Sequence, residues 1–209
     1  MKAIDPDLFV RSRLSLHGAA EMLLAGPQYE ASGDIRLRCT PGGFGTVAEP
    51  DLRVDGDELV AGPTRVRLAD RTYAEVAAAA GIAPRRLDDV YHDGPGLDVM
   101  ERLEVDRRSA LLLAEAFDAG DSALRSLAPE EEPVLWPEHF DIGIRVGETN
   151  YGVSAGDGFL PAPYAYVGPT QPQVGEFWNA PFGAARPVSG LRSAAGVLAF
   201  FLEGRSLVE

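Results

Sequence analysis

Apolar and polar residues alternate along two separate parts of this chain, and each part predicts a set of β-strands. A period of two places successive side chains on opposite faces of a strand. The pattern covers residues 35–40, 44–48, 52–54, 58–60 and 64–68, and then residues 140–146, 151–154 and 164–167. Short turns separate the strands, and Asp55-Gly56 is the clearest hairpin signal among them. We therefore expect two antiparallel meanders.

Apolar residues spaced three and four positions apart predict helices in the remaining segments. These helices cover residues 13–25, 72–80, 106–126 and 193–203. We expect Ser12 to cap the first helix and Gly26-Pro27 to end it, because proline disrupts a helix interior. Thr72 and Gly81 are expected to bound the second helix. Residues 84–103 predict a long loop, and residues 170–190 predict a loop-rich segment.

Groups of strands separated by isolated helices predict an α+β fold rather than a parallel βαβ arrangement. We expect an antiparallel sheet of two meanders with helices packed on one face. The repeated order of helix and meander hints at pseudo-duplication. At 209 residues the chain suits a single domain, 1–209, within which sub-halves 1–84 and 104–209 would share one core.

The charge balance excludes several classes of partner. The formal net charge is -13, which disfavours binding to nucleic-acid phosphates and to anionic lipid surfaces. No apolar run is long enough to span a bilayer, so no membrane association is expected. The N-terminal segment MKAIDPDLF lacks the cationic and apolar regions of a signal peptide. We therefore expect a cytoplasmic protein.

The single cysteine, Cys39, limits the redox and metal chemistry of the chain. One cysteine can form neither an intrachain disulfide nor a multi-cysteine metal site. Cys39 alternates with the apolar residues Ile35 and Leu37, which favours a buried structural thiol. The three histidines show no local metal-ligand spacing. We expect no metal and no cofactor.

Candidate chemistry concentrates around the strand predicted at 140–146. On that strand Phe140 and Ile142 would face the core, while His139, Asp141 and Arg145 would face the opposite side. An imidazole beside a carboxylate suits general-base catalysis, although a single histidine at a strand entrance is more often a structural hydrogen-bonding residue. The candidate catalytic residues are His139, Asp141 and Asp157. Asp157 also lies between two glycines, where turn chemistry explains it adequately.

Aromatic residues nearby suggest the walls of a ligand pocket. Tyr164 and Tyr166 share one face of the strand predicted at 164–167, and aromatic rings with polar tips can bind organic molecules. The alternative is ordinary core and rim packing. The candidate ligand-binding residues are Trp136, Arg145, Tyr164, Tyr166 and Trp178.

Arginines alternate with apolar residues on two of the first strands. Arg36 and Arg38 oppose Ile35 and Leu37, and Arg65 and Arg67 repeat this pattern near Val66. Guanidinium groups match carboxylates and phosphates, so this face could bind an anion. The simpler interpretation is a solvated sheet face whose arginines are neutralised by nearby carboxylates.

Three hypotheses for the function follow from these residues. The leading hypothesis is a protein that binds a small organic molecule, which the arginines allow to be anionic. The second is a hydrolase or isomerase that uses His139 as a base with Asp141 or Asp157. The third is a protein–protein interaction module that docks a partner, or a second copy in a homo-oligomer, through the aromatic loop 177–182.

Several distinctive segments resemble a family of actinobacterial proteins of unknown activity. The likeness runs over most of the chain, and the segments that carry it are 14–18 (LSLHG), 40–47 (TPGGFGTV), 135–141 (LWPEHFD), 150–167 (NYGVSAGDGFLPAPYAYV) and 177–184 (FWNAPFGA). The resemblance implies a soluble bacterial protein. It implies no activity and no catalytic residues.

Overall fold

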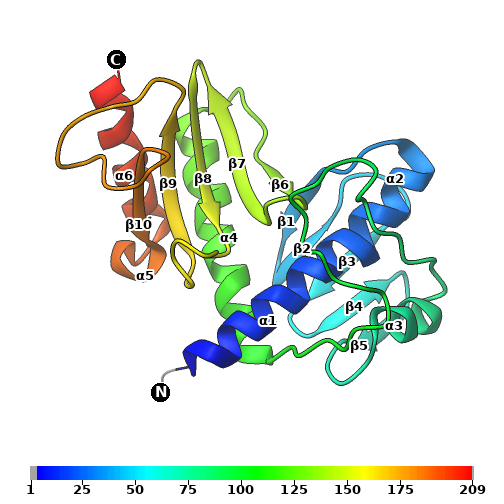
Figure 1. Ribbon diagram of the computed structural model, residues 1–209. Coiled ribbons are helices and arrows are strands. Elements are labelled where there is room, and N and C mark those ends of the chain that lie inside the picture. Colours follow the sequence, from blue (N-terminus) through cyan, green and yellow to red (C-terminus); the bar gives the residue numbers. More distant parts are fainter. Residues whose placement is uncertain (1–3, 209) are drawn as a thin grey trace. The chain divides into compact units, whose positions relative to one another are not determined.

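The computed structural model describes residues 4–208, so the first three residues of the segment considered for a signal peptide lie outside the described residues. Contacts group the chain into two compact units (Figure 1). The N-terminal unit comprises Met1–Glu115 and Leu135–Phe140, and the C-terminal unit comprises Ala116–Val134 and Asp141–Glu209. The division therefore passes through helix α4 (Arg107–Leu127) and not through the loop between the predicted sub-halves. Helices accompany antiparallel strands in both units, which confirms the α+β prediction.

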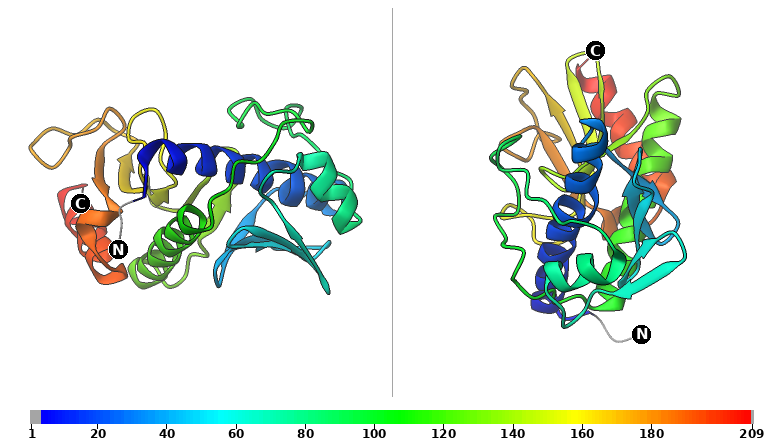
Figure 2. Two further views of the ribbon diagram at one scale, coloured as in Figure 1. Left: turned by 90° about the horizontal axis from the view of Figure 1, so that it is seen from below. Right: turned by 90° about the vertical axis from the view of Figure 1, so that its right-hand side faces the viewer.

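The N-terminal unit begins with a continuous helical rod (Figure 2). It consists of α1 (Pro6–Ala19), the π-helical segment η1 (Ala20–Ala25) and α2 (Gly26–Ser32). The prediction that Gly26-Pro27 ends a helix capped by Ser12 is wrong. Asp5 caps α1, and Ser12 is buried inside it. The wider π-helical turn, in which the Gly26 amide bonds to the Glu21 carbonyl, accommodates the proline that follows without breaking the rod.

Six strands form the sheet of the N-terminal unit. They are β1 (Leu37–Thr40), β2 (Gly43–Thr46), β3 (Leu52–Asp55), β4 (Glu58–Ala61), β5 (Thr64–Arg67) and β6 (Val134–Trp136). Their order is β6-β1-β2-β3-β4-β5, and consecutive pairs are antiparallel. The first meander is thus confirmed. Strand β6 was not predicted, because three residues are too few to display an alternation.

A short helix and a long loop complete this unit, and both were predicted correctly. Helix α3 (Tyr73–Ala80) starts with a capping box between Thr72 and Glu75 and ends at Gly81, which adopts a φ of 73°. The Tyr73 hydroxyl donates a hydrogen bond of 3.0 Å to the Ser15 carbonyl and so joins α3 to the rod. Residues 84–103 carry no helix or strand.

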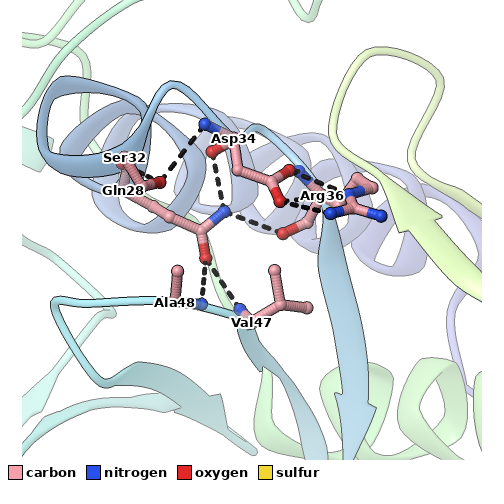
Figure 3. A network of polar contacts seen from close by, with 6 residues as sticks. All are labelled: Gln28, Ser32, Asp34, Arg36, Val47 and Ala48. Atoms are coloured by element: carbon pink, nitrogen blue, oxygen red, sulfur yellow. Dashed lines mark hydrogen bonds and ion pairs between the residues drawn. The ribbon is translucent and has the colours of Figure 1, made fainter.

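A buried amide ties the end of the rod to the sheet (Figure 3). The Gln28 side chain has 0% exposure and makes four hydrogen bonds to backbone groups. Its nitrogen donates to the carbonyls of Asp34 and Arg36, each at 2.8 Å. Its oxygen accepts from the amides of Val47 and Ala48 at 2.7 and 2.8 Å. Both ends of the amide are therefore satisfied by segments on either side of the β1–β2 hairpin.

Four strands and the covering helices form the C-terminal unit. The strands are β7 (Asp141–Val146), β8 (Thr149–Ser154), β9 (Tyr164–Pro169) and β10 (Ala184–Pro187), and the helices are α5 (Val188–Leu191), α6 (Ala194–Val208) and the end of α4. The strand order is β10-β9-β8-β7, and each pair is antiparallel. The second meander is thus confirmed, with β10 as an additional strand inside the segment predicted to be loop-rich.

One face of the C-terminal sheet forms the core of this unit. Ile142 and Val153 are paired across β7 and β8, and both lie against Gly120 of α4. Gly204 of α6 approaches Val167 of β9 in the same way. Figure 1 shows α4 and α6 on the same side of these strands. The helices therefore cover one face of the sheet, as predicted.

Within residues 4–208, no helix combines the length and the apolar character needed to cross a membrane.

Candidate functional site

The face of the C-terminal sheet that α4 and α6 leave uncovered gathers several of the predicted site residues. Strand pairing aligns Asp141 with Ser154 and Ser154 with Tyr164. In the next row, Gly143 is aligned with Gly152 and Gly152 with Tyr166. We call this surface the aromatic–carboxylate face, and its residues are Asp141, Asp157, Phe159, Tyr164, Tyr166 and Phe182.

Tyr166 lies flat across the sheet and bonds to Asp141. A Cβ atom on Gly152 would collide with the Tyr166 hydroxyl, and one on Gly143 would lie 3.0 Å from it. These two glycines therefore form a shelf on which the ring rests. The hydroxyl donates a hydrogen bond to Oδ2 of Asp141, a carboxylate that is only 8% exposed. Glycine at these positions of β7 and β8 thus lets a phenol from β9 meet a carboxylate from β7 across three strands.

Tyr164 makes a second pair with Asp157, in the connection between β8 and β9. The Tyr164 hydroxyl donates to Oδ2 of Asp157 at 2.6 Å. The other oxygen, Oδ1, accepts from the amides of Phe159 and Leu160 at 2.7 and 3.0 Å. The turn function predicted for Asp157 is therefore confirmed. In addition, the carboxylate anchors a tyrosine, which the sequence did not indicate.

Both phenols stay protonated over the physiological pH range. Burial raises the pKa of Tyr166 well above its ordinary value, and the negative charge of Asp141 adds to this effect. Burial also raises the pKa of Tyr164, with a further contribution from its hydrogen bond to Asp157. Each pair therefore consists of a neutral phenol that donates to a carboxylate.

Two phenyl rings stand above these pairs and remain accessible to solvent. Phe159 is 43% exposed and Phe182 is 38% exposed. Their ring centroids are 5.3 Å apart, and the ring planes are inclined at 74°. Phe182 also stacks on Tyr164 at 6.2 Å and meets Tyr166 edge-on at 6.5 Å. The result is an aromatic corner that packs on both tyrosines, whose hydroxyls bond to the buried carboxylate of Asp141 and to the exposed carboxylate of Asp157.

His139 does not belong to this arrangement. It lies in the turn between β6 and β7, where Phe140 adopts a φ of 51°. The prediction that His139 shares a strand face with Asp141 is therefore wrong, because the strict alternation begins only at Asp141. The His139 side chain is 59% exposed, and its Nε2 atom lies 3.9 Å from a carboxylate oxygen of Glu138. This arrangement does not favour a general base.

The histidine with a structural role in this turn is His17 of α1. Its Nε2 atom lies 2.8 Å from the Pro137 carbonyl, and its ring stacks on Phe140 at 5.2 Å and 10°. Burial lowers the pKa of His17 to about 4, so the ring is neutral at physiological pH. An uncharged imidazole thus holds the turn that contains His139.

The remaining predicted ligand-binding residues make contacts other than those of the tyrosine pairs. Trp136 is at the end of β6 in the N-terminal unit. Arg145 is exposed near the β7–β8 turn, and its Nε atom donates to the Gly147 carbonyl at 3.1 Å. Trp178 packs edge-on against Phe177, with 4.8 Å between the ring centroids.

The aromatic loop 177–182 is divided between two environments. Phe177 packs on Phe200 of α6, with 5.3 Å between the ring centroids. Phe182 instead joins the aromatic–carboxylate face. The loop therefore does not present a single apolar surface to a partner.

The strand arginines of the N-terminal unit are mostly occupied by carboxylates. Arg65 bonds to both Asp55 and Glu58, at 2.6 and 2.9 Å. Arg36 forms an ion pair with Asp34 at 2.6 Å. These contacts favour the solvated, neutralised sheet face over an anion-binding one.

A cavity of about 310 Å³ lies elsewhere in the C-terminal unit. Its lining comes from the β7–β8 turn, the segment after β9 and the end of α6, and it includes Thr149, Tyr151, Thr170 and Arg205. Thr149 and Tyr151 alternate with Gly152, so they belong to the helix-covered face. None of the predicted site residues lines this cavity.

The structure also bears on metal chemistry and on the single thiol. Among residues 4–208, no group of three or more His, Cys, Asp or Glu side chains is arranged to hold a metal ion.

Cys39 is half-buried, whereas the alternation predicted a buried thiol. It lies near the exposed turn that ends β1, which limits its burial.

Sequence reasoning missed Phe182 and the glycine shelf as parts of the site. The shelf depends on Gly143 and Gly152 being aligned across two strands, and no single strand reveals that alignment.

Comparison of the chain with protein-family models, with curated proteins and with solved structures found no match.

Proposed function

We propose that the protein binds a small organic molecule through the aromatic–carboxylate face of its C-terminal unit. The observation that carries this proposal is the pair of accessible rings, Phe159 and Phe182, above two phenol–carboxylate pairs. A ring that leaves water gains about 25 cal/mol for each Å² removed, so a flat organic group has a favourable surface to cover.

Pre-organisation supports the same proposal. The Tyr166 ring is held by the glycine shelf and by Asp141, and Tyr164 is held by Asp157. Phe182 packs on both tyrosines, so a ligand would meet an accessible ring whose support is already fixed, which lowers the entropic cost of binding. The resemblance to actinobacterial proteins leads us to propose further that this binding takes place in a bacterial cytoplasm.

The test uses three probes that share a phenyl ring and differ in charge: benzylamine, benzyl alcohol and benzoate. We expect at least one of them to shift the backbone amide resonances of Phe159, Gly152 and Phe182 in NMR titrations of the ¹⁵N-labelled protein. The double variant Phe159→Ala/Phe182→Ala should lose these shifts. It removes the rings but leaves both phenol–carboxylate pairs in place.

The matched control is Leu202→Ala in α6, which removes an apolar side chain of similar exposure (48%) from a different element. This variant should bind the probes like the parent protein. Shifts that persist in the double variant would refute the proposal, and so would the absence of a response to every small organic molecule tested. Shifts confined to Thr149 and Thr170 would instead place binding in the cavity.

A further inference from the structure

We propose that the ligand of the aromatic–carboxylate face is an organic cation of the quaternary ammonium class. This inference rests on the function proposed above and adds the chemical class of the ligand. It follows from the charges of the face, from the geometry of its rings and from the hydrogen bonds that are already made there.

The first argument is the uncompensated charge of Asp157. Its carboxylate accepts hydrogen bonds from two backbone amides and from the Tyr164 phenol, and all three donors are neutral. The negative charge therefore remains at the face. A bound cation would be attracted to it, whereas a bound anion would be repelled.

The arginines on strands β7–β10 are directed elsewhere. Arg145 lies on the same sheet face, but its Nε atom bonds to the Gly147 carbonyl at the hairpin turn. Arg186 of β10 lies over the rings of Phe177 and Phe200 and forms an ion pair with Glu203 at 3.2 Å. Neither contact brings a guanidinium group to Asp157.

The second argument is the geometry of the aromatic corner. Phe159 and Phe182 meet edge to face at 74°, so a single rounded group can rest in the angle between the two rings. Cations bind to ring faces through the negative potential of the π system. Tyr164 stacks on Phe182, and its donation to a carboxylate increases the electron density on its own ring. The corner therefore combines accessible rings with the exposed carboxylate of Asp157, to which Tyr164 links both of them.

The third argument concerns hydrogen bonding. Both oxygens of Asp157 already accept hydrogen bonds, so a primary ammonium would find few further acceptors there. A quaternary ammonium has no N–H groups to satisfy. Its methyl groups can contact the rings without leaving a donor unpaired.

The experiment compares choline with two compounds of nearly the same shape. The neutral isostere is 3,3-dimethylbutan-1-ol, and the anionic analogue is 3,3-dimethylbutanoate. We expect choline to shift the amide resonances of Phe159 and Phe182 with a dissociation constant at least about tenfold lower than that of the alcohol. We expect the anion to bind more weakly than either. Added salt should weaken the binding of choline and leave that of the alcohol unchanged.

Two variants separate the charge from the apolar surface. Phe159→Leu keeps an apolar side chain but removes the π face, so the preference for choline over the alcohol should fall several-fold. Asp157→Asn keeps an amide oxygen for the turn but removes the charge, so in this variant too the preference for choline over the alcohol should fall. Circular dichroism of both variants verifies that the fold is retained.

The outcomes distinguish this inference from the function on which it rests. Equal affinities for choline and the alcohol, or a preference for the anion, would overturn the cationic class and leave ligand binding at this face intact. The same conclusion follows if choline causes no shifts while a benzyl probe does. If neither the choline series nor the benzyl series causes shifts, both proposals fail. A choline preference that survives Phe159→Leu and Asp157→Asn would also overturn the inference.

Discussion

Replacing Gln28 by methionine should destabilise the N-terminal unit more than any other polar substitution we consider. Methionine has the same length and suits a helix, so the volume and the backbone propensity change little. The substitution removes only the amide head group, which makes four hydrogen bonds of 2.7–2.8 Å (Figure 3).

The magnitude follows from the four backbone groups that lose their partner. Each hydrogen bond contributes about 1 kcal/mol net, and a backbone group left unsatisfied in a buried site costs about 1–3 kcal/mol. Val47 is exposed and Ala48 is half-buried, so water can reach part of the opened site. We therefore take the lower value for each bond and expect a total of about 4 kcal/mol. Domains have a free energy of unfolding of about 5–15 kcal/mol, so this loss is large.

Tryptophan fluorescence allows each unit to be followed separately. The chain has two tryptophans, with Trp136 in the N-terminal unit and Trp178 in the C-terminal unit. In a Trp178→Phe background, urea unfolding monitored at Trp136 reports the N-terminal unit alone. With a slope of about 2 kcal/mol per molar urea, the midpoint should fall by about 2 M.

The control is Ser32→Ala in the same network. Ser32 is exposed and donates to the Gln28 carbonyl, but it makes none of the four bonds of the Gln28 side chain. Its removal should cost less than about 1 kcal/mol because water replaces the hydroxyl. A Gln28→Met protein within about 1 kcal/mol of the parent would refute the view that this amide holds the rod to the sheet.

Two further predictions concern other structural positions. The folded-state pKa of His17 is lowered to about 4 from 6.5, so the unfolded state binds more protons between these values. The free energy of unfolding should therefore fall by up to about 3 kcal/mol as the pH drops from 6.5 to 4. In urea titrations at several pH values, His17→Gln should remove this dependence. Parallel pH profiles of the parent protein and the variant would contradict the prediction. Gly152→Ala should lower the free energy of unfolding reported by Trp178 by about 1–3 kcal/mol, because the new Cβ collides with the Tyr166 ring and with the Ile142 carbonyl. Gly158→Ala meets no atom within 4 Å and should change stability by less than about 0.5 kcal/mol, and equal effects of the two substitutions would rule out the glycine shelf.

Local sequence patterns were sufficient where neighbouring residues alone decide the conformation. The Asp55-Gly56 turn forms the β3–β4 hairpin as expected, and Thr72 and Gly81 bound α3. In each case the signal and the structure lie within a few residues of each other. The same reasoning failed at Pro27, where a π-helical turn lets the rod continue and pack against the rest of the unit.

The candidate site was predicted in part. Alternation along a strand correctly placed Tyr164 and Tyr166 on one face, and Asp141 on the matching face of β7. The same alternation failed for His139, because Phe140 adopts a left-handed conformation in the turn that His17 supports. A single strand carries no information about such a contact from a distant helix.

The sequence by itself determined the α+β class, the two meanders and the shared sheet face of Asp141, Tyr164 and Tyr166, because side-chain periodicity is a local property of the backbone. Only the tertiary structure decided which carboxylate meets which phenol. Strand register aligns Gly143 with Gly152 and leaves room for Tyr166 to reach Asp141. Register depends on hydrogen bonds between strands and on helix packing, so the chemistry of this face emerges only when the strands are assembled.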